Sequence, residues 1–103
     1  MNKDNTIITL PVFYILLSLL NGKKHGYEIM KLVDKNSEGR VKMGPGTLYG
    51  AVKRMLVSGL IEDAGEENRR KYYKITKLGK EILSSELLRM DVAIKAAGNS
   101  YIS

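Results

Sequence analysis

Residues 44–58 constrain the fold more than any other stretch of the chain. They open with Gly44-Pro45-Gly46, and glycine as N-cap before a proline at the first helical position is a typical helix start. Apolar residues then recur at i, i+4, i+7 and i+8, the spacing of one buried helix face. We therefore predict an amphipathic helix that ends at Ser58-Gly59 and has these inward residues: Leu48, Val52, Met55 and Leu56.

A β-hairpin is predicted directly after this helix. Two short β-prone runs, residues 60–63 and 71–75, flank a polar loop at residues 65–70. Side chains alternate between the two sides of a strand, so Tyr72 and Tyr73 cannot both point into the core. The loop and second run also carry the densest positive charge of the chain, so the hairpin is a candidate for contact with an anionic partner.

Three further helices are expected. Residues 11–20 are apolar on nearly every side of a helix, so this helix should be buried on more than one side. Residues 26–35 form a second helix, and residues 40–42 a short extended segment before the third. Residues 76–97 form a long fourth helix with a threonine N-cap. Its apolar residues, spaced 4, 3, 4, 3, make a short coiled-coil-like seam: Leu83, Leu87, Met90, Ile94 and Ala97.

The predicted fold is mainly α with a small β-hairpin. Helices followed by a hairpin are the plan of a winged helix-turn-helix, here with a C-terminal dimerisation helix. We expect a flexible N-terminal segment at residues 1–9, a winged-helix DNA-binding domain at residues 10–75, and a dimerisation helix and tail at residues 76–103. The third helix would enter the DNA major groove by its N-terminal half. The hairpin, or wing, would reach the phosphate backbone or an adjacent minor groove.

Charge and composition narrow the range of functions that the chain could have. The 103-residue chain has a formal net charge of +6, which favours nucleic acid or an anionic membrane as partner. It has no cysteine, and His25 is its one histidine, so neither a thiol nucleophile nor a paired-histidine metal site can form. No phosphate-loop motif is present, and we expect neither an enzyme nor a cofactor. The apolar run at residues 11–20 is too short to span a bilayer, so we expect a cytoplasmic protein without a membrane partner.

The outward face of the third helix carries glycines where side chains would be expected. A glycine at position 50 costs roughly 1 kcal/mol relative to alanine and gains nothing from core packing. It permits close approach of another backbone, although tolerated drift at an exposed site is the plainer interpretation. The positive end of the helix suits an anion, whereas a basic pair on a helix is often an ordinary solvated face. With the basic residues of the wing, the predicted DNA contacts are Gly46, Thr47, Tyr49, Gly50, Lys53, Arg54, Arg69, Arg70 and Lys71.

Three segments together resemble the PadR family of bacterial transcriptional regulators: HGYEIMKLV, GPGTLYGAVKRMLVSGLIE and RRKYYKITKLGKEIL. The resemblance covers roughly residues 10–88 and is closest to the short subgroup with a single C-terminal dimerisation helix. It implies a homodimeric repressor on a palindromic operator, and it adds Tyr27 to the DNA contacts. It also implies that the fourth helix packs against its symmetry mate and the first helix. With the seam described above, the expected dimer interface is Phe13, Tyr14, Leu17, Leu83, Leu87, Met90, Ile94 and Ala97.

Some features depart from the family pattern. Many relatives have serine where Gly44 stands and proline where Gly50 stands, so a capping hydroxyl is lost and the helix is stiffened less. A small-molecule effector at the dimer interface is expected, but the chain lacks the tryptophan on which some relatives stack planar drugs. A winged-helix module that binds another protein instead of DNA is the alternative. The basic wing weighs against that alternative.

Overall fold

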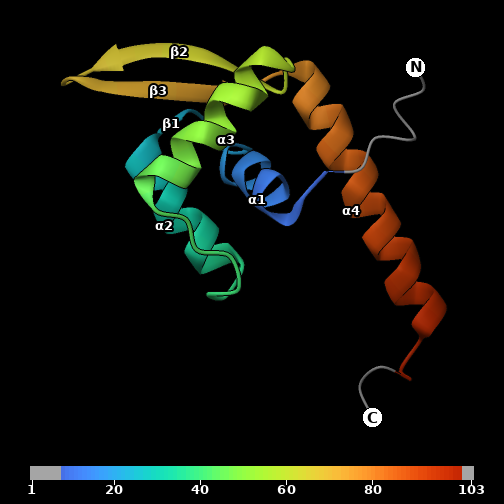
Figure 1. Ribbon diagram of the computed structural model, residues 1–103. Helices are drawn as coiled ribbons and strands as arrows, with labels where there is room; N and C mark the ends of the chain where they lie inside the picture. Colours follow the sequence, from blue (N-terminus) through green and yellow to red (C-terminus); the bar gives the residue numbers. More distant parts are fainter. Residues whose placement is uncertain (1–7, 101–103) are drawn as a thin grey trace.

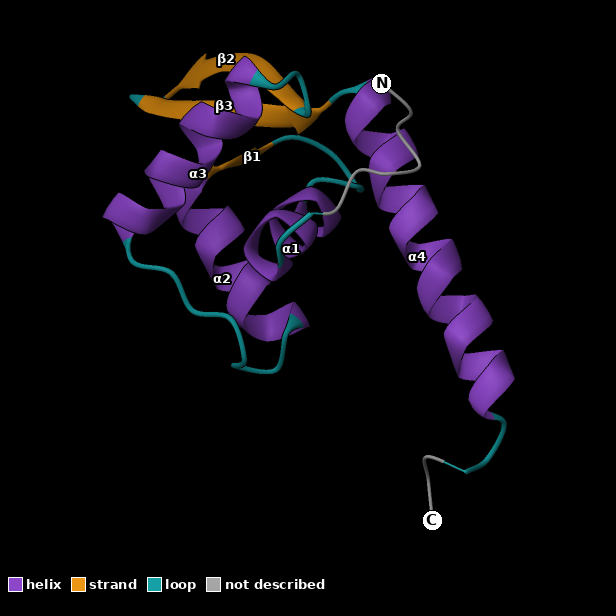
Figure 2. Cartoon of the chain, turned by 45° about the vertical axis from the view of Figure 1, so that its right-hand side comes forward, coloured by secondary structure: helices purple, strands orange, loops and turns teal. Residues whose placement is uncertain are grey.

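The structure is a computed structural model that describes residues 8–100. Most of the predicted N-terminal segment and the end of the tail lie outside the described residues. The three strands form one antiparallel sheet in the order β1-β3-β2. Figures 1 and 2 show α1, α2 and α3 gathered beneath the sheet and α4 running away from them. The elements are α1 (Leu10–Ser18), β1 (Lys24–His25), α2 (Gly26–Asn36), α3 (Pro45–Val57), β2 (Ile61–Glu67), β3 (Arg70–Ile75) and α4 (Lys77–Ala97).

The core lies where the first three helices meet the sheet and the first turns of α4. The predicted inward face of α3 is confirmed at three of its four positions, because α3 buries Leu48, Val52 and Met55. Leu56 was expected inward but is 37% exposed, and Ala51 is buried instead. At 100° per residue, Ala51 lies nearer than Leu56 to the centre of the buried stripe. A small alanine here lets α3 pack closely on its neighbours.

The sheet differs from the predicted hairpin in its strands and in the length of its loop. It has a third strand, β1, which pairs with β3. β1 has only two residues, so it is too short for an alternating pattern to predict it. The segment at residues 40–42 is not a strand among the described residues. The hairpin loop is shorter than the predicted residues 65–70, since a two-residue turn at Asn68-Arg69 joins β2 to β3. Both residues have positive φ, 52° and 65°, as a tight hairpin turn of type I′ requires.

Side-chain caps fix the starts of three helices. Thr9 accepts a hydrogen bond from the N–H of Val12 at the start of α1, and Thr76 caps α4 as predicted. His25 caps α2 in a capping box: its ring accepts from the N–H of Glu28, and the Glu28 carboxylate accepts from the N–H of His25. Gly44 begins α3 without a side-chain cap, as expected from the sequence, so the first N–H groups of α3 stay open.

The C-terminal part of α4 projects from the body of the protein (Figure 1). Ile82 and Leu83 of its first turns are buried, whereas every residue from Leu87 to the helix end is exposed. α1 ends at Ser18, two residues before the predicted boundary, and its C-cap is Leu19. None of the helices within residues 8–100 is long and apolar enough to cross a membrane.

Ser37 fixes the connection that leads from α2 to α3. Its hydroxyl accepts a hydrogen bond from the N–H of Val41 at 3.0 Å and lies 3.3 Å from the carbonyl of the same residue. Both residues are buried. Replacing Ser37 with alanine strands a buried N–H and should lower the free energy of unfolding by about 1–3 kcal/mol in urea denaturation. Ser84→Ala, on an exposed position of α4, is the control, and equal midpoints for the two variants would contradict the assignment.

Candidate nucleic-acid interface

The outer face of the first two turns of α3 is bare backbone. A Cβ atom added at Gly44 or Gly46 would meet nothing within 4 Å, and one added at Gly50 would meet only Arg54 Nη1 at 3.6 Å. Thr47 is exposed beside this face. Lys53 and Arg54 are exposed one turn further along. The described chain therefore leaves this face uncovered, with small or positively charged groups at its borders.

Tyr49 holds α3 against α2 through a glycine that the sequence reasoning missed. The phenol of Tyr49 is 47% exposed, yet its hydroxyl end lies over Gly26. A Cβ atom added at Gly26 would lie 2.2 Å from Tyr49 Oη and 2.7 Å from Cζ. A side chain at position 26 would therefore displace the phenol of Tyr49 from α2, whereas one at position 50 would meet only the tip of Arg54. No local pattern links residues so far apart in sequence.

His25 sits where α2, the sheet and the wing meet. Its Nδ1 accepts a hydrogen bond from the N–H of Glu28 at 3.3 Å, and its Nε2 lies 3.0 Å from Arg70 Nη1. The ring also packs edge-on against Tyr72, with centroids 5.3 Å apart. A neutral imidazole has one lone pair, so His25 cannot accept hydrogen bonds from both neighbours. With Nδ1 accepting from Glu28, Nε2 of a neutral ring carries the proton, so Arg70 lies beside His25 with its donors free for another acceptor.

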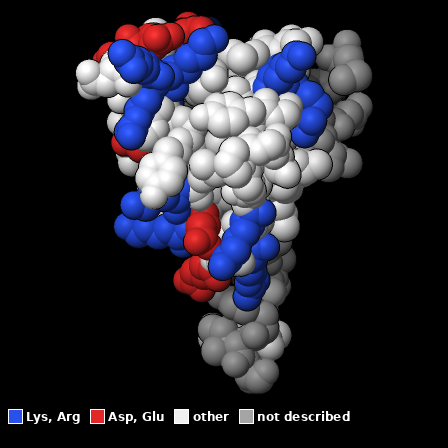
Figure 3. All heavy atoms as spheres, turned by 60° about the vertical axis from the view of Figure 1, so that its left-hand side comes forward, with Lys and Arg blue, Asp and Glu red and all other residues white. Residues whose placement is uncertain are grey.

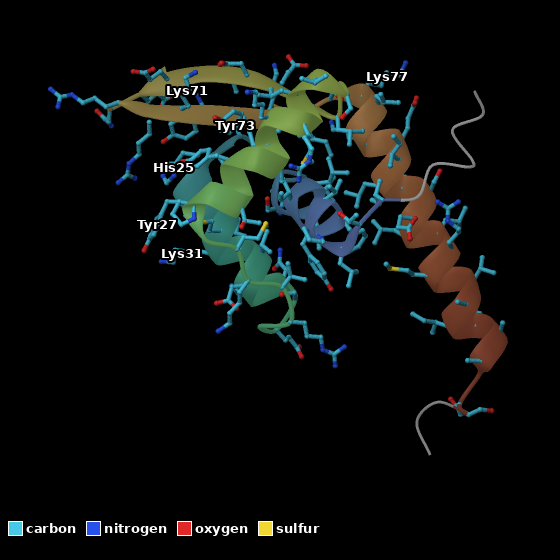
Figure 4. All side chains as sticks on the ribbon, in the orientation of Figure 1. His25, Tyr27, Lys31, Lys71, Tyr73 and Lys77 are labelled. Atoms are coloured by element: carbon cyan, nitrogen blue, oxygen red, sulfur yellow. The ribbon has the colours of Figure 1, made fainter. Side chains whose placement is uncertain are left out.

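A groove of about 530 Å³ lies between the start of α2, α3 and the wing. It brings together predicted contact residues from three separate segments of the sequence. Figure 4 shows Tyr27 on α2 and Lys71 and Tyr73 on the wing above it. The tyrosine prediction is confirmed for Tyr73, which is buried while Tyr72 is partly exposed. The groove is lined by His25, Gly26, Tyr27, Tyr49, Arg69, Arg70, Lys71 and Tyr73.

Lys31 and Lys42 extend the basic border of this face and were not predicted. Both line a shallower hollow of about 270 Å³ that also contains Tyr27. Lys31 Nζ lies 5.5 Å from the ring centroid of Tyr27, one helical turn away. The i, i+4 spacing of Tyr27 and Lys31 was a signal that the sequence offered. Figure 3 shows Lys and Arg side chains around a largely neutral centre on this side of the molecule.

Basic residues on and beside the wing divide into those with an ion-pair partner and those without one. Lys23 pairs with Glu67 of β2, and this hydrogen bond raises the pKa of Lys23. Lys74 Nζ lies 3.6 Å from Glu62 Oε2. Within residues 8–100, Arg69 and Lys71 at the tip have no such ion pair. Arg69 and Lys71 are therefore available to an external anion, as are the exposed Lys53 and Arg54 on α3.

Burial raises the pKa of the Tyr73 phenol above its usual value, and the nearby Tyr49 and Asp63 add to the effect. The phenol of Tyr73 therefore ionises only at a higher pH than an exposed tyrosine would.

The predicted dimer residues divide by burial. Phe13 and Leu83 are buried in the core of the single chain, so neither offers surface to a second subunit in this conformation. Tyr14 and Leu17 are half-buried on α1. The remaining members lie on the exposed part of α4: Leu87, Met90, Ile94 and Ala97.

The two helix glycines should respond oppositely to alanine. Gly50→Ala adds a methyl that meets only a flexible arginine tip, so it should raise the free energy of unfolding by about 0.5–1 kcal/mol. Gly26→Ala should lower it, because the added methyl displaces Tyr49 from α2. Urea denaturation of the two variants beside the unaltered protein measures both. A destabilised Gly50→Ala protein would show that the outer face of α3 is less open than described.

The sequence has relatives among known proteins. Residues 15–85 match the Transcriptional regulator PadR-like family. An uncharacterized protein of Lysinibacillus sphaericus is 33% identical over 85 residues, which are 79% of this chain and 77% of that protein. An uncharacterized protein in a Streptomyces fradiae transposon is 35% identical over 72 residues, which are 70% of this chain but only 20% of that protein.

The fold is similar to those of solved regulators. A PadR family transcription regulator from hypervirulent Clostridium difficile gives a TM-score of 0.74 at 26% identity, over 92% of this chain and 100% of that one. Bacillus subtilis PadR in complex with operator DNA gives 0.66 at 23% identity, over 77% of this chain and 47% of that one, a likeness of fold. Members of the family are transcription regulators rather than enzymes. With the match over residues 15–85, this chain belongs to the PadR-like family of transcriptional regulators.

Proposed function

We propose that this protein is a homodimeric, sequence-specific DNA-binding repressor. α3 would enter the major groove and the wing would lie on the neighbouring backbone. The observation that carries the proposal is the bare outer face of α3, bordered by Tyr27, Tyr49 and the basic tip of the wing. The fold it shares with Bacillus subtilis PadR, solved on operator DNA, supports the same mode of binding.

The glycines on α3 bear on how deeply the helix can dock. The major groove of B-DNA is about 12 Å wide. A helix with its side chains is about 10–12 Å across, so a groove leaves little room around it. Without side chains at Gly46 and Gly50, the leading face of α3 can approach the bases or a phosphate strand more closely. Thr47 and Tyr49 then reach groups on either side, and the open N–H groups of α3 suit a phosphate.

The wing would contribute positive charge for contacts with phosphates rather than contacts with base edges. Arg69, Arg70 and Lys71 would each neutralise a phosphate, and Arg69 at the turn is placed to enter a narrow minor groove. A phosphate is a stronger acceptor than the ring of His25, so Arg70 would leave His25 on binding. Binding of this kind depends steeply on salt.

The projecting part of α4 supports a dimer. It exposes large apolar side chains, which a soluble chain usually covers with a partner. At 100° per residue, Leu88 and Val92 lie nearly opposite the seam that contains Leu87 and Ile94. A helix that is apolar on two sides needs two neighbours. The α4 helix of a second copy would cover the seam, and the exposed edge of its α1 would cover the other side.

A two-fold axis through this interface implies a palindromic operator, with half-sites about one helical turn or a multiple apart. A small-molecule effector between the subunits would relieve repression by changing the spacing of the two α3 helices, with α4 as the lever. The protein would act in the cytoplasm, where the chromosome is accessible.

Neutralising the wing should weaken binding to every duplex. In the variant Arg69→Gln, Arg70→Gln, Lys71→Gln, the slope of log Kd against log salt should flatten by about 0.9 for each phosphate that is no longer neutralised. Fluorescence anisotropy with a random duplex over a salt series measures it. The control is Lys77→Gln, Lys80→Gln, Lys95→Gln, with the same change of charge on α4. Figure 4 shows Lys71 and Lys77 towards opposite ends of the hairpin.

Equal slopes for the two triple variants would make the wing assignment wrong. If the unaltered protein fails to bind duplex DNA at any salt concentration, the alternative of a protein-binding module is favoured instead.

Gly50→Ala should change the stability of the protein and its affinity for DNA in opposite directions. Gly50→Ala should bind a duplex selected by the unaltered protein from a random pool about tenfold more weakly, or worse, because its methyl group holds α3 away from the groove. The same substitution is expected to stabilise the free protein, so misfolding cannot explain the weaker binding. Tyr49→Ala should also weaken specific binding. Unchanged affinity for Gly50→Ala would place the outer face of α3 away from the DNA.

A further inference from the structure

The segment T-K-L-G, residues 76–79, takes no part in the proposed DNA and dimer surfaces. It lies where the end of α3, the start of β2 and the first turn of α4 meet. α3 ends with hydrogen bonds from Leu60 N–H to the Met55 carbonyl, 3.0 Å, and from Gly59 N–H to the Leu56 carbonyl, 3.2 Å. With Gly59 at φ +79°, this is a Schellman motif. It turns the chain directly into the start of β2.

Thr76 ties α4 to this turn with a single hydroxyl. Thr76 Oγ1 lies 2.6 Å from the Gly59 carbonyl oxygen and 3.0 Å from that of Leu60, so its one proton is directed at both. The same oxygen accepts a hydrogen bond from the N–H of Gly79 at 3.0 Å, which caps α4. The N–H of Thr76 also donates to the Leu60 carbonyl, at 3.1 Å. One residue therefore caps α4 and attaches it to the two residues that follow α3.

Gly79 allows the first turn of α4 to rest on this attachment. A Cβ atom added there would lie 2.2 Å from the carbonyl oxygen of Leu60 and 2.8 Å from Ile75 Cγ1. The first of these is a backbone atom, which cannot move aside without shifting the joint, that is, the contact between Thr76 and the Gly59-Leu60 turn. Any side chain at position 79 would therefore tilt α4 away from the end of α3.

We propose that Thr76 and Gly79 are positioning residues that fix the direction of α4 relative to α3, and through it the half-site spacing that the dimer accepts. The second part rests on the proposed function. The 21 residues of α4 span about 30 Å. A tilt of about 10° at the joint would move the far end by about 5 Å, more than the rise of one base pair, about 3.4 Å. Even a small change at Thr76 would thus alter the spacing of the two α3 helices of a dimer along the DNA.

The direction of α4 can be measured within one chain. The sequence has no cysteine, so Val57→Cys and Lys95→Cys place two spin labels at exposed sites on α3 and α4. Labelled chains are diluted with unlabelled ones, and electron–electron double resonance gives the distance distribution. Thr76→Val should broaden it, Thr76→Ser should keep it narrow, and Gly79→Ala should shift its mean.

Two further variants separate the joint from helix capping. Thr76→Asp keeps an acceptor for the N–H of Gly79, but an ionised carboxylate cannot donate to the carbonyls of Gly59 and Leu60. It should fold and still broaden the distribution, even if Thr76→Val does not fold. Thr9→Val removes a comparable cap from α1, where the N–H of Val12 donates to Thr9 Oγ1 at 3.3 Å, and should leave the distribution unchanged. A distribution for Thr76→Asp as narrow as that of the unaltered protein would overturn the proposal.

The consequence for DNA is tested on duplexes selected by the unaltered protein, with one base pair added or removed between the half-sites. The affinity of the unaltered protein should fall about tenfold or more for each such change, and that of Thr76→Asp markedly less. Equal decreases would overturn the link between the joint and half-site spacing. If the unaltered protein selects no duplex, the proposed function fails and that link fails with it. The distances within the chain still decide whether Thr76 fixes α4.

Discussion

The packing of α3 is the constraint on which the rest of the structure depends. One face of this helix must be buried to complete the core, through Leu48, Val52 and Met55. The opposite face must stay open if it is to meet a partner. Its first two turns meet both demands by carrying glycine where most exposed helices carry longer side chains. Gly50 thus lowers the stability of α3 at a position where no packing inside the protein requires a glycine.

Elements around α3 fix its position from two sides. Tyr49 packs over Gly26 of α2, and the Schellman turn with Thr76 connects α3 to the wing and α4. His25 links the same region to the wing, because it caps α2 and lies against Arg70. The proposed DNA-binding face is consequently a composite of α2, α3 and the hairpin. Its geometry changes if any of these interactions is broken.

The arrangement connects the proposed DNA surface to the proposed dimer surface through a short path. α4 starts against the residues that end α3, and its exposed apolar part begins within three turns of that point. In the proposed dimer, a ligand or substitution that tilts α4 would act on the spacing of the two α3 helices rather than on their internal structure.

The sequence alone determined the elements whose signals are local. Proline and glycine fixed the start of α3, Thr76 the start of α4, and the apolar spacing the inward face of α3 apart from Leu56 and Ala51. It also located the basic residues of the wing. Only the tertiary structure decided β1, the two-residue turn, the burial of Phe13 and Leu83, and the contacts of Gly26 and Gly79. These depend on which distant segments come together. Hydrophobic periodicity and capping report a residue's neighbours along the chain, whereas a strand pair or a close glycine contact is set by neighbours in space.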